Sequence, residues 1–168
     1  MLLLNKLLGK QTMLKLQSRI FASHYQFYIH DADYEHYDDP RLSWEDGEKL
    51  DYGYMATESA VYVSTKSDLN DHCVKVYVGE TPNKSMYETV FVHTVEVSSG
   101  RLFISSPSGE DLEDSLEINN GKYTISICGK NMGKDMFSYK EEFDEDMEDE
   151  EYCRLDKFES YDVFLESA

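Results

Sequence analysis

The chain has 168 residues and a formal net charge of −18; apolar residues make up 40% of it, and aromatic residues alone account for 13%. This length fits one ordinary domain with a hydrophobic core, and the aromatic content is too high for a wholly disordered acidic chain. The acidity argues against nucleic-acid binding and against docking on anionic lipid, since both need Lys and Arg, and it favours a basic protein partner.

The charge is unevenly distributed along the chain. Residues 1–30 carry four basic side chains and no acidic one, a charge of +4, so residues 31–168 carry −22. We treat residues 1–15 as an N-terminal extension, because Lys6 and Lys10 interrupt its apolar opening before it reaches the length of a signal peptide or a membrane span. The extension is either a short amphipathic helix, with Leu2, Leu3, Leu7 and Leu14 on one side, or the product of a start assigned upstream of Met13.

From Leu16 onward the apolar residues recur with period two, which predicts strands. The first candidate runs to His30 as one long or broken strand. Seven more lie at residues 61–65, 74–78, 90–97, 101–105, 115–118, 123–128 and 161–165. Turn-forming residues separate them, as at Ser99-Gly100 and Asn120-Gly121. We predict an all-β fold for residues 16–168: a single antiparallel β-sandwich of about seven or eight strands.

Two long acidic connections, residues 31–52 and 135–159, interrupt the strand pattern. The second contains nine carboxylates between Glu141 and Glu151. Such a run is either a solvated, self-repelling loop or a contact surface; binding residues are often placed on long loops. The predicted partner-binding residues are Tyr34, Glu35, Tyr37, Asp38, Asp39, Trp44, Glu45 and Asp46 in the first connection, and Glu141, Glu142, Asp144, Glu145, Asp146, Glu148, Asp149, Glu150 and Glu151 in the second.

The three cysteines, Cys73, Cys128 and Cys153, show no metal-binding spacing. An odd number suits a reducing compartment better than a disulfide framework. We therefore interpret all three as reduced thiols and expect the protein in the cytoplasm.

The sequence lacks the motifs of the common catalytic sites. Phosphate-binding loops, dinucleotide-binding loops, zinc-protease helices and nucleophile elbows are all missing, so we expect no catalytic residue and no cofactor. The five histidines, His24, His30, His36, His72 and His93, are scattered, which favours structural roles. Asp144, Asp146 and Glu148 alternate as at the start of a calcium loop, but the required Gly and the closing Glu are absent, so we expect no dedicated metal site.

Several short motifs resemble the ComJ family. They are Ser23-His24-Tyr25-Gln26-Phe27, Trp44, Gly53-Tyr54-Met55-Ala56, Tyr87-Glu88-Thr89-Val90 and Gly121-Lys122-Tyr123. The resemblance spans residues 18–166 and implies a small acidic β-sandwich that inhibits a DNA-entry nuclease, or an immunity protein acting against a nuclease toxin. It supplies no set of functional residues, and both the basic extension and the acidic run after Lys140 depart from the family pattern.

Three functions are compatible with these features. The preferred hypothesis is a non-catalytic inhibitor whose carboxylates occlude the basic active site of a nuclease, with Tyr34, Tyr37 and Trp44 as desolvated anchors. The alternative is a phage- or plasmid-encoded DNA mimic that blocks a DNA-binding protein. The third is a calcium- or carbohydrate-binding module. The expected partner is a basic protein, neither nucleic acid nor membrane; the oligomeric state, the strand order and the contacting loop stay open.

Overall fold

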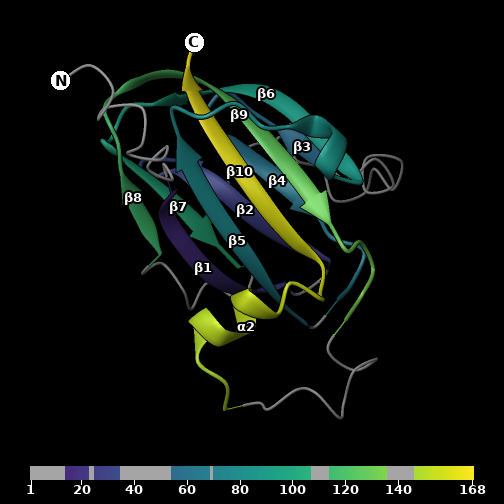
Figure 1. Cartoon of the computed structure of the whole chain (residues 1–168). Coiled ribbons are helices and arrows are strands. Elements are labelled where there is room, and N and C mark those ends of the chain that lie inside the picture. The colour runs from purple at the N-terminus through teal and green to yellow at the C-terminus, as the bar shows by residue number, and fades with distance from the viewer. Residues whose placement is uncertain (1–13, 23–24, 35–53, 69, 107–113, 136–145) are drawn as a thin grey trace, which may run out of the picture.

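Ten strands and one short α-helix form the part of the chain that the structure, a computed structural model, describes: residues 14–22, 25–34, 54–68, 70–106, 114–135 and 146–168 (Figure 1). The strands are Leu14–Ala22 (β1), Gln26–Asp31 (β2), Tyr54–Ala56 (β3), Ala60–Ser64 (β4), Asn70–Val78 (β5), Thr89–Val97 (β6), Arg101–Ser105 (β7), Ser115–Glu117 (β8), Gly121–Lys130 (β9) and Ser160–Ser167 (β10). The helix α2 is Asp149–Leu155, and a 3-10 turn, η3, spans Lys84–Met86.

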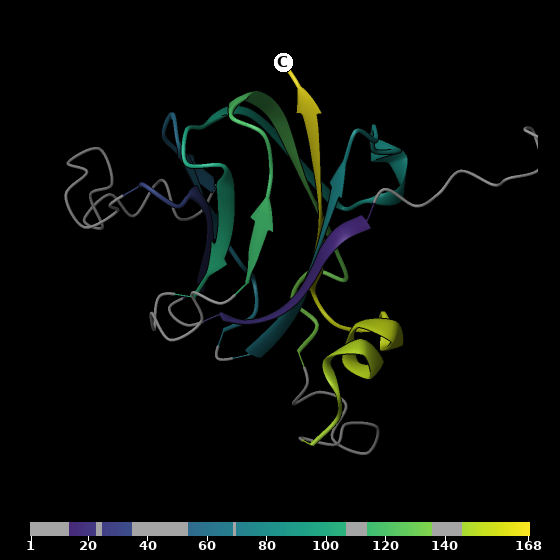
Figure 2. The same cartoon turned by 90° about the vertical axis from the view of Figure 1, so that its left-hand side faces the viewer.

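The strands form two five-stranded sheets that face each other (Figure 2). Sheet A has the order β1-β5-β10-β9-β6, and sheet B has the order β3-β4-β2-β7-β8. Side chains alternate between the two faces of a strand, so Ile20 and Val74 of sheet A enter the core while their neighbours Arg19 and Cys73 lie on its outer face. The predicted all-β sandwich is confirmed.

The strand pattern differs from the prediction in two places. The first candidate breaks at Tyr25, whose φ is 57°, and its halves enter different sheets as β1 and β2. The strand β3 was not predicted; it has three residues and pairs with β4 through Tyr54 and Val63. The chain therefore has more strands than the seven or eight expected.

A purely antiparallel arrangement was also wrong in one place. The strands β5 and β10 run parallel, from Ser160 opposite Cys73 to Leu165 opposite Val78. Both are central strands of sheet A and are buried on their inner faces. Pairing between segments this far apart in sequence leaves no local signal, because the turn residues between neighbouring strands specify only hairpins.

The predicted boundaries fall partly outside the described residues. β1 begins at Leu14, so the last two residues of the predicted extension 1–15 belong to the sandwich. Of the connection 31–52, residues 35–52 lie outside the described part; of the connection 135–159, residues 136–145 do. The second connection was predicted as a loop, but its described portion contains α2. In the described segments, no helix is long and apolar enough to cross a membrane.

The interpretation of all cysteines as reduced thiols was wrong for two of the three. Cys73 on β5 and Cys153 on α2 form a disulfide, with their Cα atoms 5.4 Å apart. They are separated by 80 residues and meet because Cys73 points out of sheet A, where α2 packs. Cys128 is free and buried, and its burial raises the pKa of the thiol to about 11.

Candidate functional site

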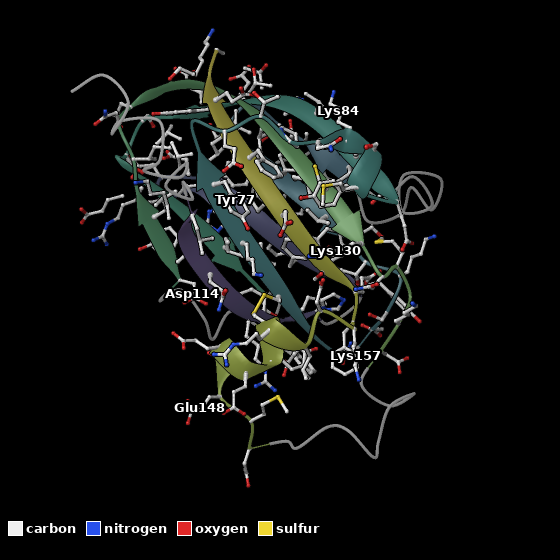
Figure 3. The ribbon with its side chains drawn as sticks, viewed as in Figure 1. Tyr77, Lys84, Asp114, Lys130, Glu148 and Lys157 are labelled. Carbon is white, nitrogen blue, oxygen red and sulfur yellow. A yellow bond between two sulfur atoms is a disulfide. The ribbon has the colours of Figure 1, made fainter. Side chains whose placement is uncertain are left out.

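Five of the predicted carboxylates are described and exposed, and we call them the acidic end of α2: Asp146, Glu148, Asp149, Glu150 and Glu151. Three of them form the first turn of the helix. Negative side chains stabilise this position because the helix macrodipole is positive there. Figure 3 places Glu148 at the lower end of the molecule, beside the ribbon of α2 and beyond the edge of sheet A. The acidic end is therefore both locally favoured and open to solvent.

The opposite side of α2 is packed against the outer face of sheet A. Tyr152 and Cys153 are buried there, and the Cys73–Cys153 disulfide joins the helix to β5. The Tyr152 hydroxyl donates a hydrogen bond of 2.5 Å to the Asp71 carbonyl, and its ring stacks on Phe158 with centroids 5.4 Å apart. A helix of seven residues is not stable by itself in water, so these contacts hold it in place.

Arg19 on β1 connects the helix, the sheet and the acidic end. Its guanidinium carbon lies 4.3 Å from the centroid of the Tyr152 ring. Its Nε atom lies 2.8 Å from the Asp71 carboxylate, and its Nη1 atom donates to the Met147 carbonyl at 2.7 Å. The Asp149 carboxylate is 3.6 Å from the same Nη1 atom. Arg19 thus fixes the chain directly before α2 as well as the helix itself.

The C-terminal end of α2 is fixed by β9 and the turn that follows it. The helix ends at Leu155 and is capped by Asp156, a non-glycine residue in the left-handed region with φ of 50°. The Lys130 ammonium lies 2.9 Å from the Asp156 carboxylate. The Asn131 side-chain amide donates a hydrogen bond of 3.0 Å to the backbone carbonyl of Asp156. Both ends of α2 are therefore attached to sheet A.

A fully buried carboxylate, Glu159, anchors the chain between α2 and β10. It accepts hydrogen bonds from the backbone amides of Lys66, Ser67 and Gly133, and its Oε2 atom is 2.7 Å from His72 Nε2. Burial by itself would raise the pKa of Glu159. The interaction with His72 lowers it, as do the hydrogen bonds from the backbone amides of Lys66 and Ser67. These effects outweigh burial, so the pKa of Glu159 lies below its ordinary value. His72 Nδ1 lies 2.9 Å from the Asn70 carbonyl, so both ring nitrogens of His72 have a buried partner.

Ser67, His72 and Glu159 are the residue types of a hydrolytic triad, but their arrangement is structural. Ser67 Oγ and Glu159 Oε2 both contact the same histidine nitrogen, Nε2, at 2.9 Å and 2.7 Å. In a catalytic triad the acid and the nucleophile sit on opposite ring nitrogens and the nucleophile faces a cleft. His72 and Glu159 have 0% exposure, so no substrate reaches them. The predicted structural role for His72 is confirmed.

Tyr34 is the single predicted residue of the first connection that the structure describes. Tyr34 packs on the cluster of Tyr28, Ala60 and Tyr62, and its hydroxyl lies 3.4 Å from the Tyr62 hydroxyl. This cluster lies on β2 and β4 of sheet B, whereas α2 lies outside sheet A, as Figure 2 shows. Tyr34 and the acidic end of α2 therefore do not form one patch. The other predicted residues, Glu35, Tyr37, Asp38, Asp39, Trp44, Glu45, Asp46, Glu141, Glu142, Asp144 and Glu145, lie outside the described residues.

The sequence reasoning missed the residues that hold the site. Arg19, Tyr152 and Cys153 organise α2, and no periodic pattern marks them because the helix has only seven residues. The available signal was the presence of apolar residues inside an acidic run, at Met147, Tyr152 and Phe158. Two of these are buried and the third, Met147, is half-buried.

A groove of about 660 Å³ opens at the other end of the sandwich, between the start of β1 and β8. Val78, Leu116 and Ile118 line its floor, and Lys15, Ser99, Arg101, Glu117 and Asn119 are among its polar lining residues. No nucleophile and base converge there within hydrogen-bonding distance among the residues that the structure describes. Across all the residues that the structure describes, no group of three or more His, Cys, Asp or Glu side chains is placed to hold a metal ion.

Two solved structures have a fold similar to that of this chain. The crystal structure of ComJ from Bacillus subtilis, an inhibitor of the DNA-degrading activity of NucA, superposes with a TM-score of 0.62 over 95% of this chain and 100% of that one, at 17% identity. The chain has the ComJ fold. A second match, crocagin biosynthetic gene J, has a TM-score of 0.54 and 14% identity over 89% of this chain and 95% of that chain. No protein-family model matches the sequence, and neither does any curated protein.

Proposed function

We propose that this protein is a non-catalytic inhibitor that occludes the basic, DNA-binding cleft of a nuclease. The observation that carries the proposal is the acidic end of α2: five exposed carboxylates, three in the first turn of the helix and two directly before it, on an element cross-linked to sheet A. The ComJ fold and the net charge of −18 support the same assignment. A nuclease cleft presents Lys and Arg to phosphates, and carboxylates occupy such positions without offering a bond to cleave.

The attachment of α2 matters because it lowers the cost of binding. A mobile acidic loop loses conformational entropy when it is ordered against a partner, whereas side chains on a fixed helix lose little beyond their own rotamers. Arg19 holds the backbone within the acidic end, at Met147, and the disulfide and the Lys130–Asp156 pair hold it directly afterwards. The acidic end of α2 therefore supplies both the attractive field and a fixed contact surface.

The first acidic connection completes the proposed contact surface as a second element. Tyr37 and Trp44 are residue types enriched at binding hot spots, and the neighbouring acids Glu35, Asp38, Asp39, Glu45 and Asp46 extend the negative field. Tyr34 packs against sheet B, whereas α2 packs against sheet A. A single partner that contacts both elements must therefore reach around one end of the sandwich. Otherwise the two elements contact the partner separately, each on its own face.

An inhibitor that protects its own cell acts in the cytoplasm, and this compartment stays a prediction. The cytoplasm was first inferred from an odd number of cysteines interpreted as reduced thiols. The disulfide removes that reason, because persistent disulfides are typical of oxidising compartments. Fractionation of the native organism, with detection of the protein in the cytoplasmic and exported fractions, decides between the two compartments.

The test is a DNA-degradation assay with the purified chain, using NucA as the first probe and then the nucleases encoded in the organism's own genome. We expect one of these enzymes to be inhibited stoichiometrically. The variant E148Q/D149N/E150Q/E151Q should lose inhibition. The matched control E58Q/E80Q/E96Q/E117Q removes the same number of exposed charges away from α2 and from the first connection, and it should retain inhibition. If no nuclease is inhibited, or if both variants behave alike, the proposed function is wrong.

A further inference from the structure

Phe21 is an exposed aromatic side chain on the outer face of sheet A. Its neighbours Ile20 and Ala22 are buried, whereas Phe21 is 38% exposed. Side chains two residues apart lie on the same face of a strand, so Phe21 points to the same side as Arg19, which contacts α2. β1 and α2 are in contact at this end of the sheet (Figure 1). The outer face beside α2 therefore carries an exposed ring.

Tyr25 is a second exposed aromatic residue, directly before β2, where the chain passes from sheet A to sheet B. It is 50% exposed, and its backbone is in the left-handed region with φ of 57°. The Tyr25 amide donates to the Asp68 carboxylate at 2.9 Å, and the Thr65 amide donates to the Tyr25 carbonyl at 2.8 Å. These bonds hold Tyr25 in a conformation that is unfavourable for a residue with a side chain, so its ring projects from a fixed backbone.

The chain at the start of β5 connects these two residues with α2. Phe21 lies opposite Asp71 in the pairing of β1 with β5, and Tyr25 is bonded to Asp68, which precedes the same strand. The Asp71 carbonyl also accepts the hydrogen bond from Tyr152 of α2. Phe21, Tyr25 and the acidic end of α2 therefore lie at one end of the sandwich.

Few large apolar side chains are exposed in the described part of the chain. Besides Phe21 and Tyr25 they are Leu14, at the opposite end of β1, Met86 in η3 and Val92 on β6, at the opposite edge of sheet A. None of these three is aromatic, and none lies at the acidic end of α2. Single exposed apolar residues are ordinary on a protein surface. Two aromatic residues beside exposed carboxylates are instead typical of a binding interface, where apolar anchors are surrounded by polar groups.

We propose that Phe21 and Tyr25 are the apolar anchors of the surface that binds the nuclease. This role rests on the proposed function, since it needs the nuclease as the partner. A cleft rich in arginine fits the surface, because a guanidinium group pairs with carboxylates and also stacks on aromatic rings. Arg19 makes both contacts inside the molecule, with Asp71 and Tyr152. Carboxylates attract the partner from a distance, whereas desolvated aromatic side chains slow its dissociation.

The test measures association and dissociation of the full-length chain with the nuclease that the inhibition assay identifies, with NucA tried first. In F21T/Y25N, threonine suits a strand and asparagine tolerates the left-handed region, so the fold should persist, which circular dichroism checks. Both substitutions leave the net charge unchanged. We expect the dissociation rate constant to rise at least about tenfold, whereas the association rate constant and its salt dependence should hardly change.

Three further variants show whether the rings themselves matter. F21Y/Y25F keeps both rings and should dissociate as slowly as the wild type. F21L/Y25L keeps apolar area without aromatic faces and should dissociate faster than F21Y/Y25F; equal rates would exclude stacking by arginine. L14T/M86Q removes two exposed apolar side chains away from the acidic end of α2 and should behave like the wild type.

The outcomes separate this role from the proposed function. Inhibition of a nuclease with equally slow dissociation from F21T/Y25N and from the wild type would overturn the role of the two rings alone. Equally fast dissociation from F21T/Y25N and from L14T/M86Q would also overturn it, because the effect would not belong to this end of the sandwich. If no nuclease is inhibited, the role and the proposed function are both wrong.

Discussion

The guanidinium of Arg19 lies 4.3 Å above the ring of Tyr152 and joins the first strand of the sandwich to the helix that precedes its last strand. Both groups are largely buried: the Arg19 side chain is 11% exposed, and Tyr152 is 2% exposed. Burial raises the pKa of the Tyr152 phenol, as does the charge of Asp71, while the charge of Arg19 opposes them. The phenol therefore stays neutral over the physiological range and remains a hydrogen-bond donor to the Asp71 carbonyl.

Arg19→Lys should destabilise the protein although it keeps the charge. A lysine cannot stack on Tyr152 and also donate to Asp71 and the Met147 carbonyl in one planar geometry, so we expect a loss of about 1–3 kcal/mol in the free energy of unfolding. Urea denaturation measures it. Arg101→Lys is the control, because Arg101 pairs with Glu117 at the surface and the change should cost less than about 0.5 kcal/mol. Equal effects of the two substitutions would contradict the role given to Arg19.

The disulfide should account for a substantial share of the stability. Cys153→Ser removes a cross-link between residues 80 positions apart, and we expect a loss of about 2–4 kcal/mol in urea denaturation. Thiol titration of the unfolded, unreduced wild-type protein should find one thiol, that of Cys128, and three after reduction. Three thiols before reduction would show that the bond does not form in solution.

The acidic end of α2 should control the rate at which a basic partner associates. For the nuclease identified by the inhibition assay, E148Q/D149N/E150Q/E151Q should lower the association rate constant about tenfold at low salt and flatten its salt dependence, since long-range attraction acts on encounter. The dissociation rate should change less. Stopped-flow mixing at several ionic strengths measures both, with E58Q/E80Q/E96Q/E117Q as the control of equal net charge. An unchanged association rate would mean that these carboxylates do not steer the partner.

Glu159, which contacts His72, should make the free energy of unfolding depend on pH in the acidic range. Because the folded-state pKa of Glu159 lies below its ordinary value of 4.5, the carboxylate contributes stability above about that pH, and this contribution is lost as pH falls through the folded-state pKa. Glu159→Gln should cost about 3 kcal/mol near pH 7, since it removes a buried carboxylate that is bonded to His72 and to the backbone amides of Lys66 and Ser67. Unfolding of both proteins between pH 7 and pH 3 measures the difference, which should narrow below about pH 4.5. A constant difference would mean that Glu159 is not ionised in the folded protein.

The class of fold and most of the strands could be predicted from local patterns. Alternating runs such as Val74–Val78 and Tyr123–Cys128 form strands as expected, and their apolar residues Val74, Val76, Ile125 and Ile127 lie in the core. Turn residues such as Gly100, with φ of 73°, marked the connection between β6 and β7, which joins sheet A to sheet B. These features depend on neighbouring residues alone.

The organisation of the candidate site could not be predicted in this way. The acidic run was evident, but nothing local indicated that Cys153 meets Cys73, that Arg19 reaches Tyr152 or that Glu159 is buried against His72. Each contact joins segments more than fifty residues apart, and the parallel pairing of β5 with β10 brings them together.

The sequence by itself thus determined an acidic, all-β molecule with charge concentrated in two connections, since composition and periodicity follow from the residues alone. Only the tertiary structure decided that part of one connection is a helix with a fixed acidic end. A short acidic segment has no stable conformation by itself, and here a distant cysteine, Cys73, and a distant arginine, Arg19, attach it to the sheet.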